Sequence, residues 1–487
     1  MTNSHLATAF HLSGVDVKIS ILIFFTFSAG IVTAVAGQTA QLDRYIEEGL
    51  AHNPSLRQEQ ADYRSAEESV REATARFMPS LWLKARYTRA DGGRSVTLPV
   101  GEIVQKSFAG TPLAVQFAGS PPPDPITLYI MPKTEQETKL QLVQPLFAPT
   151  VAANYRLNRH LLSVREQATL SAALALVRDI RLAFYTCLQA RDATTVYSAA
   201  LDRSERHRSI ARKLYAAGMS SETAVARAQA AYSLSRTAYE QGRAEFTNAC
   251  RALNILVERP LDSLPDLEPP DSAAFLNLLE ATDSAGGFTD SLALSRRPEI
   301  LQLEAAATAA RAYVTVEKSG FAPTVAAAFE GGITGDRYDI TDRSAFYTAS
   351  ILLDWELFSG LGRKRKVSKA RAGLDKLLEQ TAAARRQISF QVAKTASDFA
   401  LARRTCRDGD LQVAAARKNH HTVSRQYEEG LATFNQLADA EELLTEAETA
   451  QTVARYDLFK QQAHMRYAVA ADLGTIQSVI PAKGIKP

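Results

Sequence analysis

Hydrophobic residues between Thr150 and Ala217 recur with alternating steps of four and three positions. They include Ala173, Val177, Ile180, Phe184 and Cys187. This spacing averages about 3.5 residues, which is typical of a helix that packs lengthwise against another helix. Because the stretch contains no proline or glycine, nothing in it obliges a helix to end. It predicts one helix of about 100 Å, too long to lie inside an ordinary globular domain.

A second pattern, in which apolar and polar residues alternate, begins after Pro79. The apolar set is Leu81, Leu83, Ala85 and Tyr87, and it alternates with Trp82, Lys84, Arg86 and Thr88. A period of two predicts a strand with one apolar face at about 80–89. Similar patterns predict strands at about 138–147, 324–331 and 347–358. The intervening segment 90–137, which holds glycine and proline clusters, is interpreted as a loop.

The order of these elements occurs twice in the chain. Pro54 precedes Pro79 by 25 positions, and Pro298 precedes Pro323 by the same interval. Phe147 and Phe358 each end a predicted strand. Phe147 lies 71 positions before Gly218 in the first half, and Phe358 lies 72 positions before Gly430 in the second half. Matched intervals of this kind predict an internal repeat. The first repeat is predicted at 37–287, with a helical hairpin at about 150–258 and a linker at 260–287. The second is predicted at 288–487, with a hairpin at about 363–473.

The predicted strands pose a physical problem, because the rest of the chain offers nothing to cover their apolar face. A lipid bilayer would cover it, provided that every backbone amide is paired in a closed barrel. Single-chain bacterial barrels begin at eight strands, and this chain supplies four. The strands must therefore be pooled from several copies of the chain, with the long helices continuing from the strand ends.

The N-terminal segment predicts export. Lys18 precedes the apolar run Ile19–Ile31, and Ala34-Val35-Ala36 supplies the small residues of a cleavage site. We interpret residues 1–36 as a signal peptide. The three cysteines, Cys187, Cys250 and Cys406, are far apart in the sequence, and an odd number excludes a full disulfide framework.

Composition and motifs argue against an enzyme or a nucleic-acid-binding protein. A net charge of +3 is small, and no basic stripe interleaves with aromatic residues. The sequence has no glycine-rich phosphate loop, no nucleophile elbow and no paired zinc-binding histidines of the protease type. His420 and His421 are adjacent, so their side chains point about 100° apart on a helix. We interpret them as part of a solvated face, and we predict no catalytic residue, cofactor or metal.

The doubled motifs make the chain resemble the TolC-type outer-membrane efflux proteins. The first half carries Asn53-Pro54-Ser55-Leu56-Arg57, Gln144-Pro145-Leu146-Phe147 and Tyr215-Ala216-Ala217-Gly218-Met219, and the second half carries Arg297-Pro298-Glu299-Ile300, Leu353–Phe358 and Tyr427–Thr433. The resemblance implies a mainly α fold with a transmembrane β portion. In a homotrimer, a 12-stranded β-barrel would be continued by a periplasmic α-helical barrel. It also implies a passive exit duct of a tripartite efflux or type I secretion system, with a periplasmic adaptor and an inner-membrane pump as partners.

Two groups of residues receive roles. Gly218 and Gly430 are predicted to adopt the left-handed conformation that reverses each hairpin. The resemblance implies that the exposed tips, Gly218, Met219 and Ser220 in one hairpin and Gly430, Leu431 and Ala432 in the other, contact the adaptor. It also places Gln436 and Asp439 at the pore constriction, where the family carries acidic residues. Gln436 is not acidic, so a single ring from Asp439 is expected to attract cations, and Glu441 or Glu442 could share that role.

Two other classes of protein stay open at this point. A non-conducting coiled-coil rod or adhesin would account for the helices but not for the paired strands. A periplasmic adaptor would use one helical hairpin and a large β-rich portion, whereas this chain predicts two hairpins. Within the efflux interpretation, the cargo and the class of pump are not specified by the sequence.

Overall fold

The structure is a computed structural model that describes residues 40–91, 95–109, 111, 125–129, 134–280 and 286–480. The predicted signal peptide lies outside these residues. The chain forms two compact units, each assembled from both halves of the sequence. One contains Met1–Ala66, Leu162–Ala307 and Lys376–Pro487, and the other contains Glu67–Leu161 and Thr308–Asp375. The boundaries of the two predicted repeats stay predictions.

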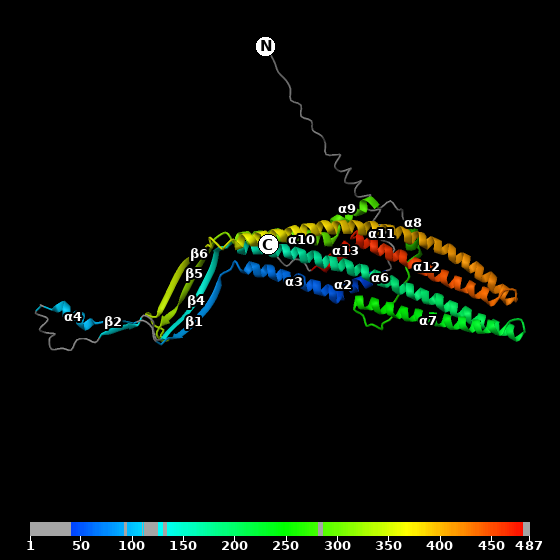
Figure 1. Cartoon of the computed structure of the whole chain (residues 1–487), viewed down its shortest axis with the longest axis horizontal. Coiled ribbons are helices and arrows are strands. Elements are labelled where there is room, and N and C mark those ends of the chain that lie inside the picture. Colours follow the sequence, from blue (N-terminus) through cyan, green and yellow to red (C-terminus); the bar gives the residue numbers. More distant parts are fainter. Residues whose placement is uncertain are drawn as a thin grey trace, which may run out of the picture. The chain divides into compact units, whose positions relative to one another are not determined.

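The second unit contains a four-stranded antiparallel sheet in the order β1-β4-β5-β6 (Figure 1). Its strands are β1 (Ser80–Arg89), β4 (Thr134–Phe147), β5 (Thr324–Gly335) and β6 (Ala345–Asp354). β4 begins before the predicted residue 138, and β6 ends before the predicted residue 358. The reason for the early end is that β5 begins only at Thr324, which pairs with Asp354, so later residues have no partner on that strand.

The prediction that 90–137 is a loop was wrong in part. Two short strands, β2 (Ser95–Leu98) and β3 (Ile126–Tyr129), pair in an antiparallel manner, and α4 (Val100–Phe108) follows β2. The glycine and proline clusters dominate the local pattern here. Each of the two strands has four residues, and its partner lies about 30 positions away, so neighbouring residues gave no signal of the pairing.

The first unit is built from helices, among them two long antiparallel pairs. Besides α4, the helices of the described residues are α2 (Ala40–His52), α3 (Pro54–Ala75), α6 (Pro149–Ala216), α7 (Glu222–Val257), α8 (Ser272–Glu280), α9 (Gly286–Arg296), α10 (Pro298–Ser319), α11 (Gly362–Glu428), α12 (Phe434–Ala468), α13 (Leu473–Ile476) and the 3-10 helix η2 (Gln477–Val479). We call α6 with α7 the first hairpin and α11 with α12 the second hairpin. Among the described helices, none combines the length and the apolar character needed to cross a bilayer.

The repeating hydrophobic positions of α6 form the centre of the main core. Ala173, Val177, Ile180, Phe184 and Cys187 are at most 1% exposed, which confirms the predicted packing seam. They cluster with buried residues of α2, α7 and α12, including Tyr45, Leu253, Tyr456 and Phe459. Helix-to-helix packing of this kind supplies most of the stability of a long helix in water.

Two of the cysteines meet in this core. Cys187 on α6 and Cys250 on α7 have their sulfur atoms 3.4 Å apart, although they are distant in the sequence. Burial raises the pKa of both thiols. The thiols are therefore held in the protonated form and behave as small hydrophobic groups.

An ion pair lies within the same core. Arg181 on α6 and Asp472, just before α13, have side chains that are 5% and 2% exposed. The guanidinium of Arg181 donates to both carboxylate oxygens of Asp472, one of them at 3.0 Å. Arg466 on α12 also donates to this carboxylate. The pair thereby joins the C-terminal segment to α6.

Candidate functional site

The two hairpins turn through the same backbone motif. Gly218 has φ +72° and Gly430 has φ +75°, which confirms the predicted left-handed conformation. In the first turn, the amide of Gly218 donates to Tyr215 and that of Met219 donates to Leu214. The second turn repeats both bonds, from Gly430 to Tyr427 and from Leu431 to Gln426. This pair of bonds defines a Schellman motif, in which glycine avoids the strain of a side chain at positive φ.

Each return helix then begins with a hydroxyl cap. Ser221 accepts a hydrogen bond from the amide of Ala224 at the start of α7. At the start of α12, Thr433 and Gln436 form a capping box, in which Gln436 Oε1 accepts from the amide of Thr433 at 2.8 Å. A capping box accepts glutamate or glutamine at this position. The non-acidic residue at the predicted constriction thus has a structural role, while Asp439, one turn later, is exposed.

The four helices of the two hairpins pack together near these turns. A hydrophobic cluster, here called the tip cluster, consists of Ala211, Ala228, Tyr427, Phe434 and Leu437. Beyond it, Met219 and Leu431 are 64% and 76% exposed. The two turns are neighbours, since a Cβ placed on Gly430 would lie 3.4 Å from the terminal methyl of Met219. The predicted tip residues are therefore gathered at one end of this unit, with large apolar side chains exposed.

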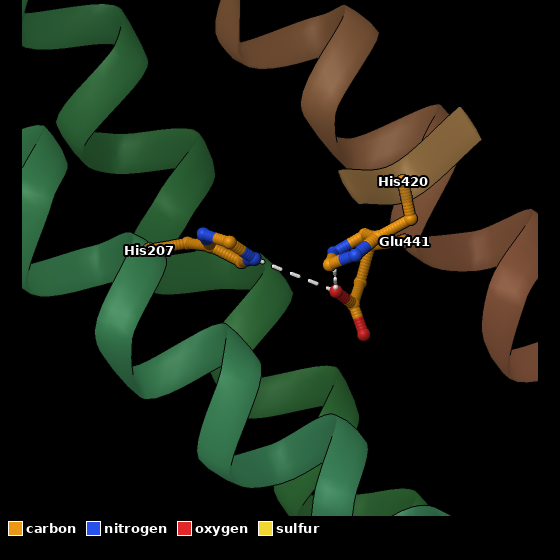
Figure 2. A group of neighbouring side chains, drawn as sticks. All are labelled: His207, His420 and Glu441. Atoms are coloured by element: carbon orange, nitrogen blue, oxygen red, sulfur yellow. Dashed lines mark ion pairs between the residues drawn. The ribbon is translucent and has the colours of Figure 1, made fainter. Parts of the chain in front are cut away.

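A polar cluster lies one to two helical turns from the tip cluster. The imidazoles of His207 on α6 and His420 on α11 are both directed at the carboxylate of Glu441 on α12 (Figure 2). Their Nε2 atoms lie 3.4 Å and 2.8 Å from Glu441 Oε2. Arg203 on α6 donates to the other oxygen, Oε1, at 2.6 Å.

The surroundings of Glu441 keep it ionised. Burial raises the pKa of this carboxyl group, but its polar contacts with His207, His420 and Arg203 outweigh burial and hold the pKa well below its usual range. The side chain is 13% exposed and is held between the hairpins. A role of Glu441 or Glu442 at the pore stays a prediction; Glu441 is engaged by these partners, whereas Glu442 is exposed.

The interpretation of His420 as part of a solvated face was wrong. Its side chain is 13% exposed and contacts Glu441, whereas its neighbour His421 is exposed. Sequence reasoning missed the cluster because its three members come from three helices, and His207 lies in the other half of the chain. The adjacent histidines His420 and His421 were the one feature of the sequence that indicated a polar cluster here, but only His420 belongs to it.

A groove of about 950 Å³ opens beside this polar cluster. Its walls come from α6, α7 and α12, with one residue from α11. They include the apolar residues Ala228, Leu234, Phe434 and Leu437 and the polar residues Ser204, His207 and Glu441. The groove therefore gives solvent a path to His207 and Glu441.

Comparison with known proteins identifies the family. The family model for outer membrane efflux proteins matches residues 45–257 and 290–471, most of the chain and both hairpins. The chain therefore belongs to the outer membrane efflux protein family. This confirms the resemblance found in the sequence and the predicted localisation, the outer membrane of a Gram-negative-type envelope with extension into the periplasm. The members of this family are channels. A search of curated protein sequences found no significant match to this chain.

Solved structures share the fold at low sequence identity. The outer membrane protein VceC of Vibrio cholerae is 20% identical with a TM-score of 0.70, and the match covers 88% of this chain and 96% of VceC. The MtrE outer membrane channel of Neisseria gonorrhoeae is 16% identical with a TM-score of 0.68, covering 88% of each chain. CusC, described with transmembrane channel formation, is 15% identical with a TM-score of 0.73, covering 88% of this chain and 92% of CusC.

Proposed function

We propose that this chain is the passive exit duct of a tripartite efflux or type I secretion system. Three copies each contribute four strands to a 12-stranded barrel in the outer membrane, and their helices form a tunnel in the periplasm. A periplasmic adaptor connects the tunnel to an inner-membrane pump, which supplies the energy. The two halves of the chain, 37–287 and 288–487, are equivalent structural repeats, and each contributes two strands and one helical hairpin to this assembly.

The observation that carries the proposal is an exposed apolar face on the sheet. Residues that are opposite each other in the register share this face, which comprises Leu81, Leu83, Tyr87, Leu140, Leu142, Phe329, Tyr347, Ile351 and Leu353. Large side chains such as Leu83 and Ile351 are more than 70% exposed on it. A contiguous apolar surface of this kind is unfavourable in water and favourable against lipid.

The opposite face of the same sheet is polar. Lys139 lies 2.9 Å from both Glu137 and Glu330, and Arg86 lies 3.2 Å from Glu135. Alternation of a lipid-facing apolar side and a polar, water-filled side is typical of transmembrane barrels with a conducting lumen. Neither a coiled-coil rod nor an adaptor gives such a sheet a role.

The edges of the sheet support assembly from several copies. In the described sheet, β1 and β6 each have one neighbouring strand. Their other edges carry backbone groups that need partners in lipid, where no water is available. Pairing β6 of one copy with β1 of the next satisfies both edges, and three copies close the barrel at the strand number that the family resemblance implies.

The tip is assigned to the adaptor. Met219, Ser220, Leu431 and Ala432 surround the two Schellman turns, and the exposed apolar side chains of Met219 and Leu431 suit burial in a partner protein. Asp439, repeated three times around the axis, would form a ring of negative charge at the constriction, with Gln436 one turn nearer the tip.

Planar-bilayer recordings test the duct and its constriction together. We expect the wild-type protein to give a cation-biased conductance, because a negatively charged ring concentrates cations in a narrow bore. Asp439→Asn should move the reversal potential in a salt gradient towards zero. Gln436→Glu should move it further from zero, because it adds a second ring while a glutamate preserves the capping box.

The outcomes separate the duct from the assigned constriction. If the wild-type protein inserted into bilayers without conducting, the duct proposal would be wrong. If it conducted but both variants kept the wild-type reversal potential, only the assignment of Asp439 and Gln436 would fail.

Valine at the two turn glycines tests the tip. Gly218→Val and Gly430→Val each place a branched side chain at positive φ, which we expect to cost about 1–2 kcal/mol locally. The large packed core lies elsewhere, so the oligomer should persist on size-exclusion chromatography while export in a strain lacking the wild-type gene is lost. Gly373→Val is the matched control, since this exposed glycine of α11 is absent from the positive-φ residues. Wild-type export by both turn variants would contradict the tip assignment.

A further inference from the structure

The cluster of His207, His420 and Glu441 has no role in the proposed duct. Each side chain offers one ligand atom, and these three atoms lie within 4.8 Å of one another (Figure 2). The first hairpin supplies His207 and the second supplies His420 and Glu441. We propose that these side chains form a binding site for a divalent transition-metal ion, that Zn²⁺ fits it best, and that the bound ion links the two hairpins.

The separations of the ligand atoms suit a tetrahedral zinc ion. Ligands at about 2.0–2.2 Å from zinc in this geometry lie about 3.3–3.6 Å apart. The contacts of Glu441 Oε2 with the Nε2 atoms of His207 and His420, at 3.4 Å and 2.8 Å, are near this range. All three ligand atoms lie within 4.8 Å of one another, so bringing the most distant pair into range needs a movement of at most about 1.5 Å.

The same atoms lack other partners in the described structure. The Nε2 atoms of His207 and His420 and Oε2 of Glu441 are buried without a hydrogen bond, because the short contacts between them do not have hydrogen-bond geometry. Buried polar atoms nearly always form hydrogen bonds, so three such atoms that converge on one another without one need an explanation. A metal ion at that point would accept a lone pair from each of them.

The chemistry of the donors and their support also favours zinc. Two imidazoles and one carboxylate are ligands that zinc takes in proteins, with a fourth position left for water. The adjoining groove, lined by His207 and Glu441, would admit that water. Arg203 holds Oε1 of Glu441 at 2.6 Å and so turns Oε2 towards the imidazoles, as an outer-shell partner does in metal sites.

Binding would stabilise the packed hairpins. The site exists only when α6, α11 and α12 are together, so an ion that binds there raises the stability of that arrangement by mass action. The position of the site, beside the tip cluster, means that this stabilisation acts on the end of the hairpins that carries the two Schellman turns.

Zinc titration of the purified, chelator-treated mature protein in detergent tests the proposal. We expect one Zn²⁺ per chain by calorimetry, a higher melting temperature with zinc, and a visible absorption band of tetrahedral character when Co²⁺ is added instead. His207→Gln and His420→Gln should each weaken zinc binding by at least about 100-fold, since loss of an outer-shell partner alone costs 10–100-fold. Glu441→Gln should do the same.

The control is His421→Gln, which removes the exposed neighbour of His420 and should leave affinity and stoichiometry unchanged. Glu441→Gln also deprives Arg203 of its partner and could disturb folding. The two histidine variants keep that ion pair and therefore decide the matter. Absence of stoichiometric zinc binding by the folded wild-type protein would overturn the proposal. So would equal binding by the His207 and His420 variants. Neither result would bear on conduction, which is measured separately.

Discussion

Replacing Asp472 by asparagine should destabilise the helical unit by about 3–5 kcal/mol, because it removes the buried carboxylate that Arg181 and Arg466 share. The side chain of Arg181 is 5% exposed and loses the carboxylate that accepts from both of its terminal nitrogens. Arg466 loses the same partner. Chemical denaturation followed by circular dichroism, with wild-type and variant protein in the same detergent, measures the loss.

A matched control uses a pair of the same chemistry at the surface. Arg251 and Asp262 are 2.8 Å apart, with side chains 47% and 81% exposed. Asp262→Asn should change stability by no more than about 1 kcal/mol, because solvent already screens that pair. An equal effect of the two substitutions would show that burial of the Arg181 pair is not what stabilises the unit.

The same pair sets a dependence on pH. Burial raises the pKa of Asp472, but its hydrogen bonds and charge attraction with Arg181 and Arg466 outweigh burial and lower the pKa below its usual 3.8. A carboxyl group with a lowered pKa in the folded state contributes stability above its unfolded pKa and loses it as the pH falls through the folded value. The difference between wild type and Asp472→Asn should therefore be constant from neutral pH to about pH 4 and should shrink only below that.

The structural features that were predicted correctly from the sequence depend on residues that are close together in the chain. The seam of α6 was predicted because helical packing repeats every few residues, and Val177, Ile180 and Phe184 are indeed buried. Gly218 and Gly430 were predicted at positive φ because a helix that reverses needs a residue without a side chain there. The first strand was predicted with its bounds, since Pro79 and the alternation after it are both local.

Features that depend on distant partners were missed. The alternation of residues continues through Leu357, but β6 ends at Asp354 because β5 starts only at Thr324. The contact between Cys187 and Cys250 required knowledge of how α6 and α7 align. The candidate metal site required three helices to be placed together, which no spacing in the sequence indicates. Contacts of this kind follow from the register between helices, and one sequence does not specify that register.

The exposed apolar face of the sheet leads to the second large expected effect. Leu83 is 71% exposed in a single copy, and its neighbours in the register are Leu140 and Gly331, on strands β4 and β5. If lipid covers this face, Leu83→Lys brings a charge into hydrocarbon and should weaken the membrane-inserted state by about 2–4 kcal/mol near the midplane. Reversible folding into lipid vesicles, followed by denaturant titration, measures the change.

Trp82→Lys is the matched control because Trp82 is the adjacent residue of β1, is 58% exposed and lies on the polar face opposite Gln141. A lysine there would face a water-filled lumen among existing charges such as Lys84 and Lys139, so we expect a change well below that of Leu83→Lys. In a water-soluble protein the order would differ, since lysine at an exposed leucine position is readily solvated and loss of a tryptophan removes more apolar contact. Greater damage from Trp82→Lys than from Leu83→Lys would therefore contradict the assignment of this face to lipid. The ranking of two neighbouring substitutions thus distinguishes lipid from water as the surroundings of the sheet.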